Sequence, residues 1–191
     1  MDHLWLALAW ILYFVIHSVL ALRSVKEYGY KKGLGTRKYR LLYVIVATLG
    51  LLAIVMYSST IQTHLVLPTA VWLKMAGLFI AVQGLLIAKW GFKSYDTRAF
   101  LGLGSLKAED EFKTDGLLKH VRHPLYAGSI LMVIGYFLFD PKWTTLISGT
   151  LVILYFLVGI YLEERKLIEA FGEKYIEYKK KTPMLIPRFW K

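Results

Sequence analysis

The chain contains no cysteine among its 191 residues, which excludes disulfide bonds, thiolate metal sites and a cysteine nucleophile. Charged residues are also scarce, because Asp, Glu, Lys and Arg together make up 19%, against about 25% in ordinary soluble domains. Hydrophobic residues account for 57% of the chain, and the mean hydropathy is +0.48. This composition predicts an integral membrane protein.

The hydrophobic residues fall into blocks of the length that a bilayer requires. Because lone strands cannot satisfy their backbone groups in lipid, we expect an all-α fold, built as a single domain over residues 1–191. The first block begins almost at Met1 and lacks a basic leader, so we expect a retained span rather than a cleaved signal peptide. The five expected transmembrane helices cover residues 4–22, 41–57, 71–88, 125–139 and 144–162.

The positively charged residues fall mainly on one side of the membrane in the expected arrangement of spans. The formal net charge is +11, and 22 of the 24 Lys and Arg residues fall in 23–40, in 89–122 or after 162, which lie on the same side of a five-span arrangement. The positive-inside rule then places the N-terminus outside and the C-terminus in the cytoplasm. The basic residues would contact anionic lipid head groups, and no nucleic-acid partner is needed to explain them.

The fourth expected span is too short for a bilayer. Its fifteen residues would cover about 22 Å, against a hydrocarbon core of about 30 Å. We therefore expect 125–139 and 144–162 to form a helical hairpin whose cytoplasmic end is drawn into the membrane. Since the two helices run antiparallel, His123 and Glu163 should lie at the same depth, at what we call the hairpin mouth.

A basic cluster and an acidic pair flank this mouth. The stretch KHVRHP gathers four basic or titratable side chains directly before Pro124, and proline is well tolerated at the start of a helix, whose end carries partial positive charge. The cluster suits a carboxylate or another electron-rich ligand, or else it anchors a helix at the interface. Glu163 and Glu164 either face this cluster or form the solvated first turn of a tail helix. The four residues of the basic cluster are Lys119, His120, Arg122 and His123.

The tail reads as an amphipathic cytoplasmic helix over 163–181, with apolar residues recurring at three- and four-residue steps. It should lie on the membrane face or fold back over the hairpin mouth. Within the first span, His17 favours a hydrogen bond to a neighbouring helix over a role with substrate. Residues 95–106 read as a connector at the lipid surface.

These pieces together resemble the integral-membrane methyltransferases, a superfamily that includes isoprenylcysteine carboxyl methyltransferases and phospholipid methyltransferases. The resemblance rests on Gly116, on RHPLYAG from Arg122 to Gly128, and on the ordered set EE, FG, Y, Y and IP between Glu163 and Pro187. Within the superfamily the chain is most similar to membrane methanethiol S-methyltransferases, through HSVLA, VKEY, YDTRAFLGL and the EERKLIEAFG…PMLIP tail.

The resemblance implies an enzyme of the transferase class that uses S-adenosyl-L-methionine and releases S-adenosyl-L-homocysteine. It implies a thiol as the methyl acceptor. A prenylated cysteine carboxylate, a phospholipid, and a non-enzymatic membrane protein of the NnrU type remain alternatives. No metal is implied. A thiol acceptor would profit from a general base, for which His120 and Glu164 are the candidates. The residues expected to bind the methyl donor are Glu111, Phe112, Lys113, Gly116, Arg122, His123, Pro124, Leu125, Tyr126 and Glu163.

Overall fold

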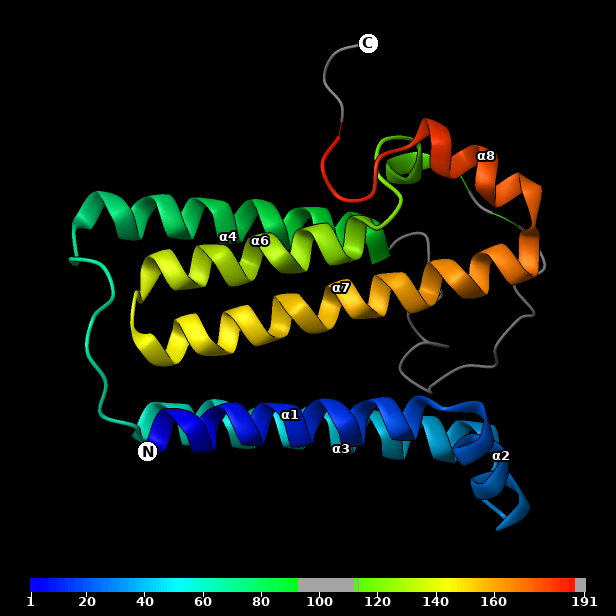
Figure 1. Cartoon of the computed structure of the whole chain (residues 1–191), viewed down its shortest axis with the longest axis horizontal. Coiled ribbons are helices and arrows are strands. Elements are labelled where there is room, and N and C mark those ends of the chain that lie inside the picture. Colours follow the sequence, from blue (N-terminus) through cyan, green and yellow to red (C-terminus); the bar gives the residue numbers. More distant parts are fainter. Residues whose placement is uncertain (93–111, 113, 188–191) are drawn as a thin grey trace. The chain divides into compact units, whose positions relative to one another are not determined.

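The computed structural model describes residues 1–92, 112 and 114–187, and every regular element within these residues is helical (Figure 1). The expected all-α fold is confirmed. The chain divides into two compact units, and the division falls inside one helix. In chain order the elements are α1 (Asp2–Ala21), α2 (Arg23–Lys31), α3 (Thr36–Thr60), α4 (Val71–Phe92), η1 (Gly116–Lys119), α6 (Pro124–Phe139), α7 (Trp143–Phe171) and α8 (Glu173–Lys181).

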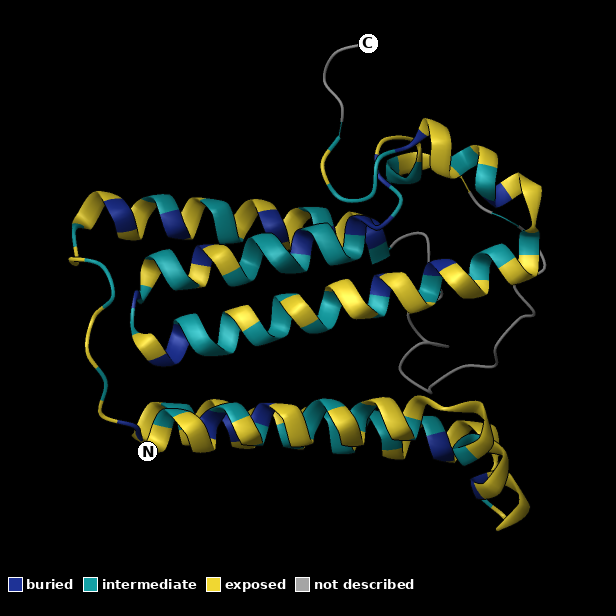
Figure 2. Cartoon of the chain, in the orientation of Figure 1, coloured by how far each residue is buried: buried dark blue, intermediate teal, exposed yellow. Residues whose placement is uncertain are grey.

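Among the described residues, four helices are long and apolar enough to cross a bilayer: α1, α3, α4 and α7. The expected fourth span appears as α6, which has 16 residues and would measure about 24 Å. The shortness expected for that span is therefore confirmed. Figure 2 shows many exposed residues along α1, α3 and α4, and these include large apolar ones such as Leu49 and Phe79. Exposed apolar side chains on such helices suit contact with lipid.

One unit contains 1–66 together with 142–151. Its helices carry polar side chains that find partners inside the unit, as an apolar environment requires. The Trp10 indole donates to Ser148 Oγ at 2.9 Å, and His17 Nε2 lies 2.7 Å from the Tyr43 hydroxyl on α3. The expected bond between His17 and a neighbouring helix is confirmed. The sequence did not predict α2, a short basic helix that follows α1 after one extended residue, Leu22.

The other unit contains 67–92, 112, 114–141 and 152–187. Its α4 and α6 lie side by side because glycines remove the side chains between them (Figure 1). A Cβ atom built on Gly84 would lie 2.5 Å from Gly128 O, and one on Gly77 would lie 2.6 Å from Gly135 O. Small residues let membrane helices approach this closely. Near the other end, Gly91 faces Leu125, so α6 begins beside the last turn of α4.

The tail differs from the expected single helix over 163–181. Helix α7 continues without interruption from its apolar part to Phe171, and α8 begins only at Glu173. The break lies at Gly172, whose φ of +55° is readily adopted by glycine and rarely by other residues. Helix α8 ends in Lys179, Lys180 and Lys181, where positive charge complements the helix dipole. This break lets the chain reverse toward η1.

Candidate functional site

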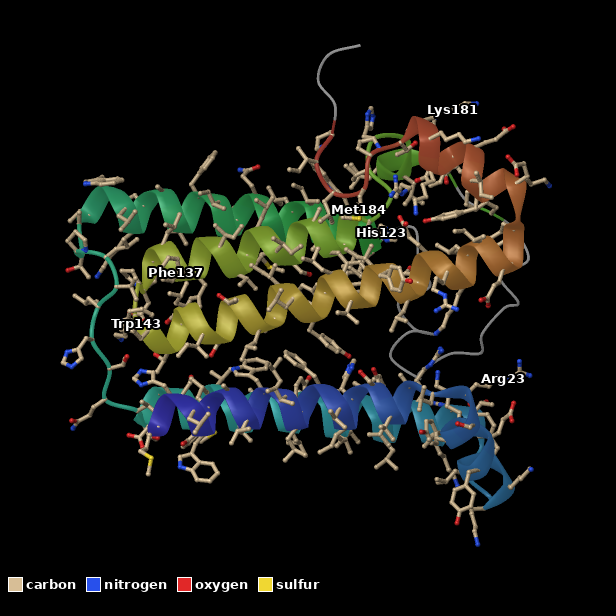
Figure 3. The ribbon with its side chains drawn as sticks, viewed as in Figure 1. Arg23, His123, Phe137, Trp143, Lys181 and Met184 are labelled. Carbon is tan, nitrogen blue, oxygen red and sulfur yellow. The ribbon has the colours of Figure 1, made fainter. Side chains whose placement is uncertain are left out.

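The chain segment after α8 pairs with the residues just before α6. The Arg122 N–H donates to Pro183 O at 2.9 Å, and the His123 N–H donates to Met184 O at 3.1 Å. Figure 3 shows His123 and Met184 close together at the end of α6. The tail therefore folds back onto the RHP segment, which is one of the two arrangements that the sequence left open.

The Arg122 guanidinium helps to hold this arrangement. Its Nε and Nη2 donate to Glu164 Oε1 at 2.9 and 2.7 Å. Its Nη1 donates to Lys179 O at 3.1 Å and to Thr182 O. These two carbonyls lie at the end of α8, where backbone acceptors have no partner within the helix. Arg122 thus joins α7 to the end of α8 and makes four hydrogen bonds to the protein itself.

Glu164 is the centre of an ion cluster, which we define as Arg122, Glu164 and Lys179. The Lys179 ammonium lies 2.6 Å from Glu164 Oε2, so each oxygen of the carboxylate faces a cation. The side chains of Arg122 and Glu164 are 8% and 9% exposed. Two cations around one buried carboxylate favour its ionised form. Glu164 is therefore a poor proton acceptor, although the sequence had offered it as a general base.

His123 lies against the ion cluster from the start of α6. It is 4% exposed, and its Nε2 lies 3.3 Å from Glu164 Oε1. Burial lowers the pKa of His123 below its usual range, the nearby carboxylates of Glu163 and Glu164 act to raise it, and Arg122 adds to the lowering. Burial prevails because a charged imidazole loses hydration there. The expected meeting of basic and acidic groups at the hairpin mouth is confirmed.

Tyr126 connects this cluster to the hairpin interior. Its ring meets the ring of His123 edge-on, with centroids 5.8 Å apart, and the ring of Phe156 on α7 at 5.6 Å. A Cβ atom on Gly159 would lie 3.3 Å from the Tyr126 hydroxyl. Residue 123 lies against 164, and residue 126 lies against 159. The residue numbers therefore rise along α6 while they fall along α7, as they do in antiparallel helices. The predicted hairpin packing of α6 against this part of α7 is therefore confirmed.

An aromatic group packs behind the ion cluster. The ring of Phe112 lies within 5.8 Å of the rings of Phe171, Tyr175 and Tyr178. The Tyr178 hydroxyl donates to Leu118 O in η1 at 2.6 Å, and Tyr175 is 1% exposed. Burial and the nearby Glu164 carboxylate raise the pKa of Tyr175. These contacts hold α8 against the segment that precedes α6.

The structure brings together part of the expected site. Pro124 is buried at the first position of α6, and Leu125 is half-buried. Glu163 is half-buried, with no hydrogen bond or ion pair to the described part of the chain, and Gly116 and His120 are exposed. Glu111 and Lys113 lie outside the described residues, as does the 95–106 connector.

Sequence reasoning did not find three tail residues that contact the RHP segment or the ion cluster: Lys179, Thr182 and Met184. The available signal was the resemblance itself, whose ordered set runs through Tyr175, Tyr178 and the PMLIP segment. That set indicated that the tail belongs with the RHP segment, but it named no contacts. The lysine run 179–181 also has an obvious second explanation in the helix dipole, which conceals the role of Lys179.

His123 gives the protein a pH-dependent stability. Its pKa is lowered from 6.5 in the folded protein. The unfolded chain therefore takes up a proton first as the pH falls, and stability is fully present only above about pH 6.5. We expect the melting temperature to fall as the pH drops below about 6.5, and to fall less steeply in His123→Gln. Equal slopes for the two proteins would contradict this.

Comparison with known proteins adds a family and named relatives. The model of the family described as phospholipid methyltransferase matches residues 71–174. Methanethiol S-methyltransferase 1 of Bradyrhizobium diazoefficiens is 32% identical over 193 residues, which cover 92% of this chain and 64% of that protein. Methanethiol S-methyltransferase of Pseudomonas deceptionensis is 30% identical over 190 residues, covering 92% of this chain and 69% of that protein. The chain thus spans less than two thirds of the length of the first of these relatives.

A plant relative has a different named acceptor. Protein-S-isoprenylcysteine O-methyltransferase B of Arabidopsis thaliana is 25% identical over 154 residues, which cover 78% of this chain and 74% of that protein. The family match begins at α4, contains both helices of the hairpin, α6 and α7, and ends at the start of α8. The ion cluster extends beyond it, because Lys179 follows the matched residues.

Proposed function

The chain belongs to the phospholipid methyltransferase family, and on that premise we propose that it transfers a methyl group from S-adenosyl-L-methionine to a thiol of the methanethiol kind. The choice of a thiol acceptor is supported by relatives that cover 92% of this chain and are named methanethiol S-methyltransferases. The support for the donor is the family together with the composition of the hairpin mouth. The reaction would take place at the cytoplasmic face of the membrane, where the positive-inside rule puts this mouth.

The residues of the mouth fit the donor in their chemistry. Glu163 is a half-buried carboxylate that makes no hydrogen bond or ion pair with the described residues, and a carboxylate in that state favours a cation or a hydroxyl donor as ligand. The donor carries both, in its ammonium and sulfonium groups and in its ribose. When bound, it supplies a methyl group already activated by positive charge on sulfur.

The other donor-binding residues follow from the same arrangement. Pro124, Leu125 and Tyr126 would line the donor from the first turn of α6, with Phe112 and Gly116 on the side of η1. Glu111, Lys113 and His123 are further donor-binding residues that the family resemblance implies. Arg122 contributes in another way, because its contacts fix Glu164 and the end of α8. It acts as a positioning residue for the mouth.

The tail explains how the mouth could exclude water. The backbone bonds from Arg122 and His123 to Pro183 and Met184 draw the segment after α8 over the start of α6. An anionic acceptor and a cationic donor lose charge on the way to the transition state, so a dry site favours the reaction. Orientation of the two reactants is the other contribution that the protein makes. Basic residues around the mouth would contact anionic lipid head groups.

A lipophilic acceptor is the second candidate. The observation in its favour is the position of the mouth at the end of a short apolar helix, which an acceptor could reach from the bilayer. The plant relative named for isoprenylcysteine is consistent with it. Methylation assays with a small thiol, a prenylated cysteine and a phospholipid, each with the same labelled donor, would separate these acceptors.

Replacing Glu163 should weaken donor binding without unfolding the protein. We expect the dissociation constant for S-adenosyl-L-homocysteine to rise roughly 10- to 100-fold in Glu163→Gln, because a hydrogen bond to a charged group contributes about 1.5–3 kcal/mol. Calorimetric titration of the detergent-purified protein measures this. Glu169→Gln is the matched control, since Glu169 is an exposed glutamate on the same helix. A folded wild-type protein without saturable binding would refute the proposed function.

A further inference from the structure

His123 has one nitrogen committed to the protein and one that is available. An ionised carboxylate can only accept hydrogen bonds, so the contact of Nε2 with Glu164 Oε1 at 3.3 Å puts the imidazole proton on Nε2. The lone pair then lies on Nδ1. This atom makes no hydrogen bond to any residue that the structure describes. A buried histidine oriented by a carboxylate, with its second nitrogen available, has the arrangement of a general base.

The charges around the imidazole suit this role. Helix α7 presents Glu163 and Glu164, which favour a positive charge on the ring, while Arg122 opposes it. Helix α8 presents Lys179 and Tyr175 to the ion cluster, and α6 presents the neutral Tyr126 edge-on to the ring. Burial lowers the pKa of His123, so the imidazole is neutral near neutral pH and can accept a proton.

We propose that His123, oriented by Glu164, is the general base that removes the proton from the acceptor thiol. This proposal rests on the proposed function. In the step, the S–H bond breaks and the proton moves to His123 Nδ1. The sulfur electron pair forms the new S–CH3 bond, while the donor's C–S bond breaks and its electron pair stays on the donor's sulfur. The products are a thioether, the neutral thioether of the spent donor, and an imidazolium beside two carboxylates.

The two bases that the sequence offered are less suitable. Glu164 is occupied by Arg122 and Lys179, and its carboxylate is already balanced by their charges. His120 is exposed, three residues before His123 and outside the buried part of the mouth. Thiols of the cysteine type have a pKa of about 8.5, so a base is needed to form thiolate near neutral pH. His123 is the described residue that combines burial, orientation and an available lone pair.

The test compares two acceptors in the full-length protein. An alkyl thiol is mostly protonated at neutral pH, whereas an acidic aryl thiol is already ionised and needs no base. We expect His123→Asn to lower the rate with the alkyl thiol by roughly 10²- to 10⁴-fold, the usual contribution of a general base, and to change the rate with the aryl thiol little. With the alkyl thiol, the rate of the variant should rise steadily with pH, as the solvent forms the thiolate.

Two further measurements separate this role from others. The affinity for S-adenosyl-L-homocysteine should fall far less in His123→Asn than in Glu163→Gln, since the proposal gives His123 a task with the acceptor in place of the donor contact that the resemblance implied. Nitrogen-15 NMR of the wild-type protein should show His123 protonated on Nε2, and this signal should change in Glu164→Gln. His120→Gln, a change in the neighbouring histidine, should keep the alkyl-thiol rate.

Several results would overturn the proposal. An equal loss with both thiols, or a loss of S-adenosyl-L-homocysteine binding in His123→Asn, would make His123 a donor-binding residue instead. A loss of the alkyl-thiol rate in His120→Gln alone would transfer the role to His120. A wild-type protein that binds S-adenosyl-L-homocysteine and methylates neither thiol would refute the thiol acceptor of the proposed function, and this proposal with it.

Discussion

Glu164→Gln is expected to lower the free energy of unfolding by about 3–5 kcal/mol, the usual cost of removing one partner from a buried ion pair. The substitution leaves the Arg122 guanidinium, whose side chain is 8% exposed, without its anion. Lys179 loses its anion as well, but it is 44% exposed and can turn to water. Most of the loss therefore comes from Arg122. Denaturant or thermal unfolding in detergent measures it.

The same substitution should release the tail. Helix α8 is held by the Lys179 bridge and by the bonds from Arg122 to its last carbonyls, and both depend on Glu164 to place the guanidinium. Trypsin should therefore cleave after the lysines at 179–181 faster in Glu164→Gln than in the wild type. Glu163→Gln is the matched control, because it makes the same change one residue earlier and removes no ion pair of the described residues. An unchanged melting temperature together with a protected tail would contradict this account.

The two glutamates show where prediction from the sequence stops. Adjacent residues on a helix point about 100° apart, so only one of the pair can face the ion cluster. Which one does so depends on the rotation of α7 about its axis, and this rotation is set by packing such as Tyr126 over Gly159. In the structure Glu164 pairs with Arg122 and Lys179, and the assignment of Glu163 to the donor, which the resemblance implies, stays a prediction.

The apolar spans, the short α6 and the meeting of charges at its end could be predicted because they follow from hydropathy and antiparallel geometry. The helix ends could not. Helix α3 extends from Thr36 to Thr60, beyond the expected 41–57. At its start an apolar window stops at arginine and lysine, although these residues favour helices. At its end the window stops at the polar residues 58–60. A glycine such as Gly172 can either continue a helix at a small cost or end it by adopting a positive φ. The tertiary contacts of α8 select the second outcome, and Gly172 has a φ of +55°.

Gly84→Ala is expected to separate α4 from α6. A Cβ atom at this position would lie 2.5 Å from Gly128 O and 2.7 Å from Met132 N, both of them backbone atoms that cannot move aside alone. Overpacking of this kind costs about 1–3 kcal/mol and sometimes more, and here a whole helix must shift. Gly128→Ala should have a similar effect, because its Cβ would lie 2.5 Å from Gly84 O. Thermal unfolding and gel filtration in detergent would show the loss.

The effect should also reach the hairpin mouth, although Gly84 contributes no side chain there. Helix α6 begins at Pro124, next to His123, and its position is fixed by α4 along a row of close backbone contacts that ends with Gly91 against Leu125. A shifted α6 displaces its first turn, which would line the donor, so S-adenosyl-L-homocysteine should bind more weakly to whatever folded protein remains. Gly35→Ala is the control, since no atom lies within 4 Å of the added carbon. Normal stability and binding in Gly84→Ala would mean that α4 does not position the site.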